Sequence, residues 1–111
     1  MGIQNWSENI ILVSLAQEPH MSEELRTVAE IVADRGDCDV VVDFSAVDII
    51  TSSNIAKLLK LRKILQDCGH RLVLCGLKKQ TRNIFLVTGL ENVFEFVDDK
   101  FIALASLQLV S

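Results

Sequence analysis

Short apolar runs alternate along the chain with stretches in which apolar residues recur at helical spacing. The runs 10–15, 38–44 and 71–75 are rich in Val, Ile and Leu and predict buried strands. The stretches 22–36 and 52–68 carry apolar residues three or four positions apart, which predicts amphipathic helices. Strand and helix therefore alternate over the first two thirds of the chain.

The last third continues this alternation. The pattern predicts a helix over 78–88 that ends at Gly89, a short edge strand over 92–97, and a final helix after Asp98 and Asp99. The complete order is β-α-β-α-β-α-β-α. Such an order indicates an α/β fold with right-handed crossovers and a largely parallel sheet.

Polar residues and glycines mark the predicted helix ends. Ser22 stands before two glutamates and predicts the N-cap of the first long helix. The pair Ser52 and Ser53 begins the second long helix, and either hydroxyl could cap it by accepting a backbone N–H bond. Gly36 and Gly69 predict where these two helices end.

Composition is that of one folded domain. The chain has 111 residues, half of them hydrophobic, and a single proline, so we expect one domain over residues 1–111 with a core of about 10–107. The net charge of −4 argues against a nucleic-acid partner, because phosphate backbones bind clustered Lys and Arg.

No apolar run approaches the roughly 18 residues that span a membrane, and no signal peptide is recognisable. We expect a cytoplasmic protein with reduced, buried thiols at Cys38, Cys68 and Cys75.

Residues that could carry out chemistry are sparse. His20 and His70 show no metal-ligand spacing, and we expect His70 to be a solvated turn residue. Acidic pairs such as Asp43 and Asp48 stand at loop edges, where carboxylates are usually solvated. Five singly scattered glycines form no phosphate-binding loop, which disfavours a nucleotide-binding or hydrolytic domain. We therefore predict no enzymatic activity, no cofactor and no metal site.

The serine pair supports two interpretations. In the structural one, a serine caps the helix and does nothing further. In the functional one, a serine at an exposed helix N-terminus presents its hydroxyl to a partner enzyme, and free N–H groups with the positive end of the helix dipole tolerate a phosphate there. That phosphate adds about −1.5 to −2 charges at pH 7, which would expel an apolar or acidic partner.

The segment from Asp43 to Leu59 resembles the signature of STAS domains, the family of the anti-sigma factor antagonists. It reads DFSAVDIITSSNIAKLL, where the family commonly begins with D-[LF]-S and has D-S-S-G at the helix start. A second stretch, LCGL at 74–77 followed by IFLVTGLENVFEF at 84–96, is similar to the family's helix, S/T-G-L turn and strand ending in Phe. The resemblance spans roughly residues 10–107. It implies a four- to five-stranded, largely parallel sheet with helices packed mainly on one face.

The resemblance also implies a regulatory binding protein. In the family, the second serine of D-S-S-G is phosphorylated by a partner that is both an anti-sigma factor and a serine kinase of the GHKL type. The unphosphorylated form binds this partner and frees the sigma factor, and a PP2C-type phosphatase restores it. Carried over by position, Ser53 is the phosphoacceptor, with Ser52 and Thr51 as alternatives. The implied partner-binding surface consists of Ile49, Ile50, Thr51, Ser52, Asn54 and Lys57.

Two positions depart from the family pattern. Thr51 stands where the family has Asp, which removes a carboxylate close to the serines. Asn54 stands where the family has Gly, and a side chain there would narrow the access of a partner backbone. These departures keep an alternative open, namely a STAS subunit that is never phosphorylated. Such a subunit would use the same helix within a stress-sensing complex or a lipid-transport ABC system.

Overall fold

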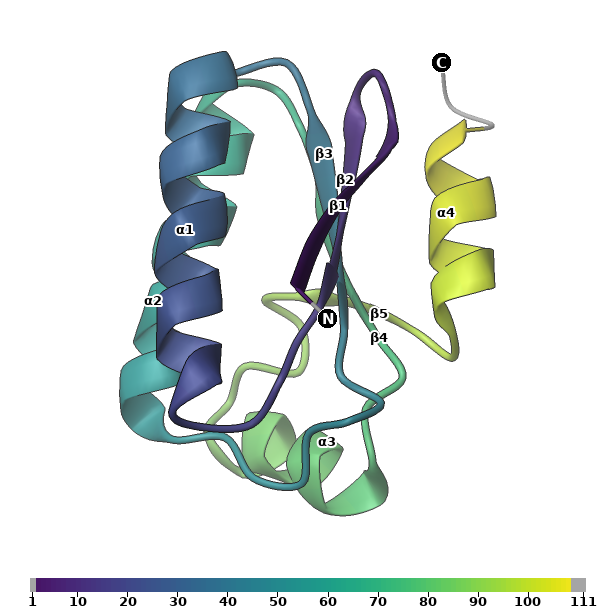
Figure 1. Ribbon diagram of the computed structural model, residues 1–111. Coiled ribbons are helices and arrows are strands. Elements are labelled where there is room, and N and C mark those ends of the chain that lie inside the picture. Colours follow the sequence, from purple (N-terminus) through teal and green to yellow (C-terminus); the bar gives the residue numbers. More distant parts are fainter. Residues whose placement is uncertain (1, 109–111) are drawn as a thin grey trace.

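The computed structural model describes residues 2–108 and shows a sheet flanked by helices (Figure 1). Five strands form this sheet in the order β1-β2-β3-β4-β5. The elements of the described chain are, in sequence order, β1 (Gly2–Ser7), β2 (Ile10–Ser14), α1 (His20–Arg35), β3 (Asp39–Asp43), α2 (Ser52–Asp67), β4 (Leu72–Cys75), α3 (Lys79–Val87), β5 (Glu95–Val97) and α4 (Lys100–Gln108).

The sheet combines one antiparallel pair with three parallel ones. β1 and β2 form a hairpin, whereas β2, β3, β4 and β5 pair in parallel. Parallel neighbours need a long crossover connection, and α1, α2 and α3 supply it. The carboxyl ends of β2, β3 and β4 therefore lie at one end of the sheet, where the connections to α1, α2 and α3 begin.

The two faces of the sheet are both covered. α1 and α2 lie side by side on one face, and α4 covers the other (Figure 1). Along β3, Val40 and Val42 join the core under α1 and α2, while Val41 joins the smaller core under α4. This alternation is the period of two that a strand imposes. Burial on both faces explains why β3 reads as a continuous apolar run.

An aromatic cluster fixes α3 at the carboxyl end of the sheet. Phe85 of α3 is fully buried. Its ring meets those of Phe44, Phe94 and Phe96 edge-on, with centroids 6.4, 5.5 and 5.4 Å away, an arrangement that aromatic pairs favour. The cluster therefore packs α3 against Phe44, the first residue of the connection between β3 and α2.

The predicted alternation of elements and the largely parallel sheet are confirmed, with ends that shift by a few residues. The strand β1 was not predicted, because half of its residues are exposed and it pairs with β2 through backbone bonds that leave no apolar pattern. The two long helices, α1 and α2, share one face, as expected from helices packed mainly on one face. α4 covers the face opposite to α1 and α2.

Two local predictions are wrong. Ser22 is not the N-cap of α1, because the helix begins at His20 and Pro19 occupies the cap position without a side-chain bond. Cys68 is exposed at the end of α2, whereas Cys38 and Cys75 are buried as expected. Burial raises the pKa of the Cys75 thiol to about 12, so this thiol stays protonated and unreactive.

Candidate functional site

The predicted serine site lies on the connection from β3 to α2, which we call the switch loop (residues 44–51). The loop leaves the carboxyl end of β3, where Asp43 accepts hydrogen bonds from the backbone N–H and the hydroxyl of Ser45, both at 3.1 Å. Gly76, with φ of +69°, passes so close that a Cβ there would lie 2.7 Å from the Asp43 carboxylate. Asp43 is therefore a buried anchor of the loop rather than the solvated acid expected from sequence.

The helix α3 holds the middle of the switch loop. Lys78, just before α3, forms an ion pair with Asp48, and this lysine lowers the pKa of the Asp48 carboxyl. The buried Thr81 donates its hydroxyl proton to the backbone carbonyl of Asp48 at 3.1 Å. Both contacts attach the loop to an element that the aromatic cluster already fixes.

The start of α1 is joined to the first turn of α2, directly after the switch loop, through Asn54. The Asn54 side chain is completely buried. Its Nδ2 donates to Glu18 Oε2 at 3.2 Å, and its Oδ1 lies 3.0 Å from the Ser22 hydroxyl. Glu18 also accepts from the backbone N–H of Ser22 at 2.9 Å, so this carboxylate caps α1 in place of the predicted serine. Bonds from Ser22, then from Asn54, together with the charge of Lys57, lower the pKa of Glu18.

The N-cap of α2 is Thr51, and neither serine serves as the cap. The Thr51 hydroxyl oxygen accepts from the backbone N–H of Asn54 at 3.3 Å, and the Thr51 carbonyl accepts from Ile55 at 3.0 Å. The prediction that Ser52 or Ser53 caps the helix is therefore wrong. Threonine is a good cap for the same reason as serine, and it releases both serine hydroxyls from a structural role.

Ser52 and Ser53 occupy the exposed first turn of α2. Lys57, one turn further along, donates from Nζ to the Ser53 hydroxyl at 3.1 Å. The residue one turn after Ser52 is Ala56, which offers no charge. Among the described residues, Ser53 is thus the serine that combines exposure, the positive end of a helix and an adjacent ammonium group.

The predicted partner-binding residues divide into two groups. Ile49 is 69% exposed, and Thr51 and the two serines also face solvent. Ile50 is only 4% exposed and Asn54 is fully buried, so neither forms part of the outer surface. The prediction that Asn54 narrows partner access is likewise corrected, because its side chain points inward to Glu18 and Ser22. No sequence signal linked Glu18 to this site, since it lies 36 residues before Asn54.

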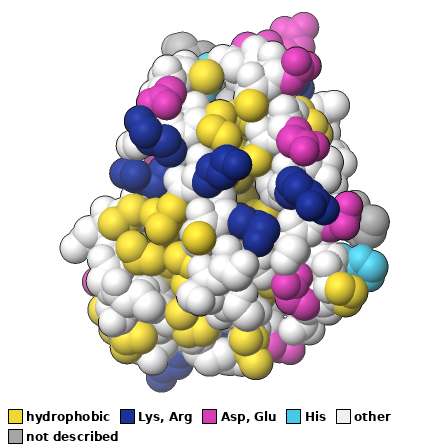
Figure 2. Space-filling view, turned by 90° about the vertical axis from the view of Figure 1, so that its left-hand side faces the viewer, with side chains coloured by type: hydrophobic (Ala, Val, Ile, Leu, Met, Phe, Trp, Pro, Cys, Tyr) yellow, Lys and Arg dark blue, Asp and Glu magenta, His cyan; other side chains and the backbone are white. Residues whose placement is uncertain are grey.

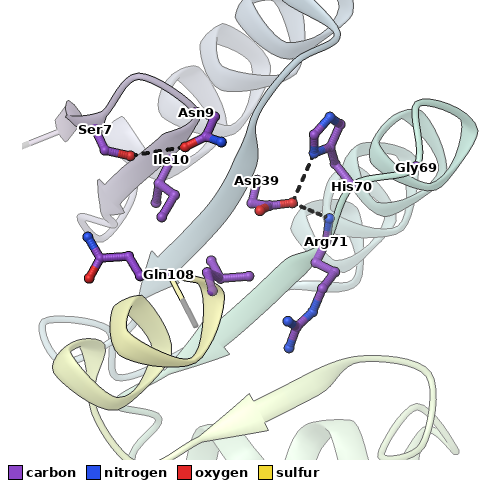
Figure 3. A pocket seen from close by; sticks show the side chains of 9 residues that line it. Ser7, Asn9, Ile10, Asp39, Gly69, His70, Arg71 and Gln108 are labelled. Carbon is purple, nitrogen blue, oxygen red and sulfur yellow. Dashed lines mark hydrogen bonds and ion pairs between the residues drawn. The ribbon is translucent and has the colours of Figure 1, made fainter. Parts of the chain in front are cut away.

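A hollow of about 470 Å³ lies at the opposite end of α2, beside the amino ends of β3 and β4 (Figure 3). Asp39 Oδ1 accepts from the backbone N–H of Arg71 at 2.8 Å and lies 3.1 Å from His70 Nδ1. His70 is therefore a turn residue as predicted, but it is partly buried and paired. The Arg71 guanidinium binds Glu95. The charged groups of this hollow already have partners within the fold.

The described residues 2–108 contain no cluster of three or more His, Cys, Asp or Glu side chains arranged to hold a metal ion. Within the same residues, no helix is both long enough and apolar enough to cross a membrane.

Known proteins resemble this chain over most of its length. The anti-sigma factor antagonist BtrV of Bordetella bronchiseptica is 29% identical over 87 residues, which are 78% of this chain and 75% of BtrV. The structure of SpoIIAA from Bacillus in its phosphorylated form superposes with a TM-score of 0.72 at 16% identity, over 98% of this chain and 97% of that one. A variant of RsbS from Moorella thermoacetica gives a TM-score of 0.77 at 16% identity, over 99% and 98%.

At such low identities the two structures establish the shared fold alone. The sequence model of the STAS domain covers residues 10–101, which include every strand of the parallel part of the sheet and the whole of the switch loop. The chain therefore belongs to the STAS domain family.

Proposed function

We propose that this protein is an anti-sigma factor antagonist that is switched by phosphorylation of Ser53. Unphosphorylated, it binds an anti-sigma factor that is also a GHKL-type serine kinase, and the sigma factor is released. The kinase transfers phosphate to Ser53 and ends the interaction, and a PP2C-type phosphatase reverses the modification. We place these steps in the cytoplasm, where sigma factors act.

The observation that carries this proposal is the surrounding of Ser53. Its hydroxyl is exposed, it is not needed as a cap, and its oxygen lies 3.1 Å from the Lys57 ammonium. A phosphate at this position would face a lysine and the positive end of a 16-residue helix. The fold would therefore tolerate the modification while the surface charge changes sign. The name of BtrV supports the role of an anti-sigma factor antagonist, and the phosphorylated form of SpoIIAA supports a phosphorylation site in this fold.

The test is a kinase assay with purified GHKL-type serine kinases from the host organism. Wild type and Ser52→Ala should each gain one phosphate in the presence of ATP, as measured by intact-protein mass spectrometry, and Ser53→Ala should gain none. Phosphate on the Ser53→Ala variant, at Ser52 or Thr51, would contradict the assignment. Thr51→Asp restores the acid of the family while it keeps a good N-cap. A change in its phosphorylation rate would therefore report recognition by the kinase and not helix stability.

Thr51 also gives the second candidate its support. Without the family's carboxylate beside the serines, the same helix could act in a STAS subunit that is never phosphorylated, within a stress-sensing complex or a lipid-transport ABC system. Affinity purification of the tagged chain from its host separates the two proposals. A transporter ATPase as the stoichiometric partner would replace the first proposal by the second.

A further inference from the structure

A groove runs between α1 and α2 on the outer side of the helix layer. Its volume is about 350 Å³. The floor is apolar and consists of Leu25 and Ala29 from α1 together with Ile64 from α2. Figure 2 shows this face of the molecule, with hydrophobic side chains visible between Lys and Arg side chains across its middle.

The rim of the groove is basic. Arg26, Lys57 and Lys60 line it, against the single acid Glu30, while the whole chain carries a net charge of −4. Within residues 2–108, the Lys60 side chain makes no hydrogen bond or ion pair. Arg26 lies 3.3 Å from Glu23, but both side chains are well exposed, and such pairs are weak. The positive charge of the rim is therefore available to an acidic partner.

Lys57 connects this groove with Ser53. Its side chain lines the groove, and its Nζ donates a hydrogen bond to the Ser53 hydroxyl. A phosphate on Ser53 would bring about −1.5 to −2 charges next to Lys57 at pH 7. That charge would cancel most of the positive excess of the rim. The modification would thus act on a surface that extends well beyond the serine itself.

We propose that the α1–α2 groove binds an acidic amphipathic helix of a partner protein, and that negative charge at Ser53 weakens this binding through Lys57. An apolar floor between basic rims matches a helix whose leucine face is bordered by glutamates, since helices bind in grooves through residues spaced three and four apart. The docking surface itself follows from the groove alone, whereas its regulation rests on the proposed phosphorylation.

The first arm of the test measures docking on the full unphosphorylated chain. The probe is a synthetic helical peptide with leucines at i, i+3, i+4 and i+7 and glutamates between them, and a second peptide carries lysines in place of the glutamates. In a ¹H–¹⁵N titration the acidic peptide should shift the resonances of residues that line the groove. Lys60→Glu should weaken its binding about fivefold through charge repulsion, and Lys63→Glu, on α2 outside the groove, less than about twofold.

The second arm measures the coupling to Ser53 with two variants of equal charge. Ser53→Glu places a carboxylate one turn before Lys57 and should weaken peptide binding about fivefold. Ser52→Glu adds the same charge in the same helical turn, but the residue one turn further along is Ala56 and not a lysine. This variant should therefore weaken peptide binding less than about twofold. Equal affinities of wild type and Ser53→Glu would overturn the coupling.

Three outcomes would overturn the docking surface: resonance shifts that map elsewhere, equal binding of the acidic and basic peptides, or an unchanged affinity of Lys60→Glu. The kinase assay is independent of all three. Failure of Ser53 phosphorylation would end the proposed phosphorylation switch and leave the peptide affinities as they are. Failure of peptide binding would show that the groove is not a docking site, and phosphate incorporation would be unaffected.

Discussion

The two ends of α2 both lie beside polar residues, but these residues have different roles. At the carboxyl end of the sheet, Asp48, Glu18 and Asn54 attach the switch loop to α3 and α1, and Ser53 is left exposed above them. At the amino end there is a hollow of about 470 Å³, where Asp39 is paired with His70 and the Arg71 backbone. The charged groups that line this hollow are paired within the fold, whereas the start of α2 presents a hydroxyl beside a lysine.

The two ends of α2 therefore differ in the groups that they leave available to a partner. A binding module needs a rigid surface with available groups. At the start of α2, the contacts of Asp48 and Asn54 make the surface around Ser53 rigid. The contacts join this region to α3 and to the start of α1, so the exposed serine is positioned by two other parts of the chain. Substitutions at the residues that anchor the switch loop should therefore lower the free energy of unfolding more than matched substitutions at the carboxyl end of α2.

The largest expected effect is that of Gly76→Ala. Gly76 has φ of +69°, and its Cβ would lie 2.7 Å from the Asp43 carboxylate that anchors the switch loop. Backbone strain and the displaced carboxylate together should lower the free energy of unfolding by about 2–4 kcal/mol. Urea denaturation measures this change.

Gly69→Ala is the matched control from the other end of α2. Gly69 also has a positive φ, of +77°, but nothing lies within 4 Å of the added Cβ. Only the backbone strain remains, and the cost should be about 1 kcal/mol. Equal losses in the two variants would show that Asp43 moves freely and does not anchor the loop.

The fold was largely predictable, because burial on both faces of the sheet and one-sided burial of the long helices produce distinct apolar periods. Val40 to Val42 and the leucines of α2 carry these signals. The position of Ser53 at the start of α2 was equally readable. The strand β1 was not, because backbone pairing with β2 leaves no pattern in its exposed side chains.

The anchors of the switch loop were not predictable, because they join residues that are distant in sequence. Glu18 and Asn54 are 36 residues apart, and Thr81 lies 33 residues after the carbonyl it binds. Thr51 shows a different difficulty. Three consecutive residues, Thr51, Ser52 and Ser53, could each cap a helix, and only the backbone conformation selects the threonine.

The second prediction concerns Asn54→Gly, which restores the residue common in the family. The variant loses the bonds that join α2 to Glu18 and Ser22 and places a glycine within the helix. Its free energy of unfolding should fall by about 1–2 kcal/mol. Ser52→Gly, an exposed site in the same turn, should lose no more than about 1 kcal/mol. Equal losses would indicate that the buried amide contributes no net stability.

The third prediction uses pH. Bonds from Ser22 and Asn54 hold the pKa of Glu18 below its ordinary value of 4.5 in the folded chain. The ionised carboxylate therefore stabilises the fold above this value, and the stabilisation is lost as the pH falls through the lowered pKa. Glu18→Gln should reduce the fall in melting temperature between about pH 5 and pH 3. Glu23→Gln changes an exposed acid in the first turn of α1; it is the control and should retain more of the wild-type fall.

The smallest effect is expected from His70→Gln, and it tests whether the two ends of α2 are independent. Asp39 keeps its bond from the Arg71 backbone when His70 is changed, and the pair is partly exposed. The free energy of unfolding should therefore change by no more than about 0.5 kcal/mol. Phosphate incorporation at Ser53 should equal that of wild type, since no anchor of the switch loop is touched. A reduced rate of phosphorylation in this stable variant would show that the helix transmits a change between its ends, and the functional separation of the two regions would then be wrong.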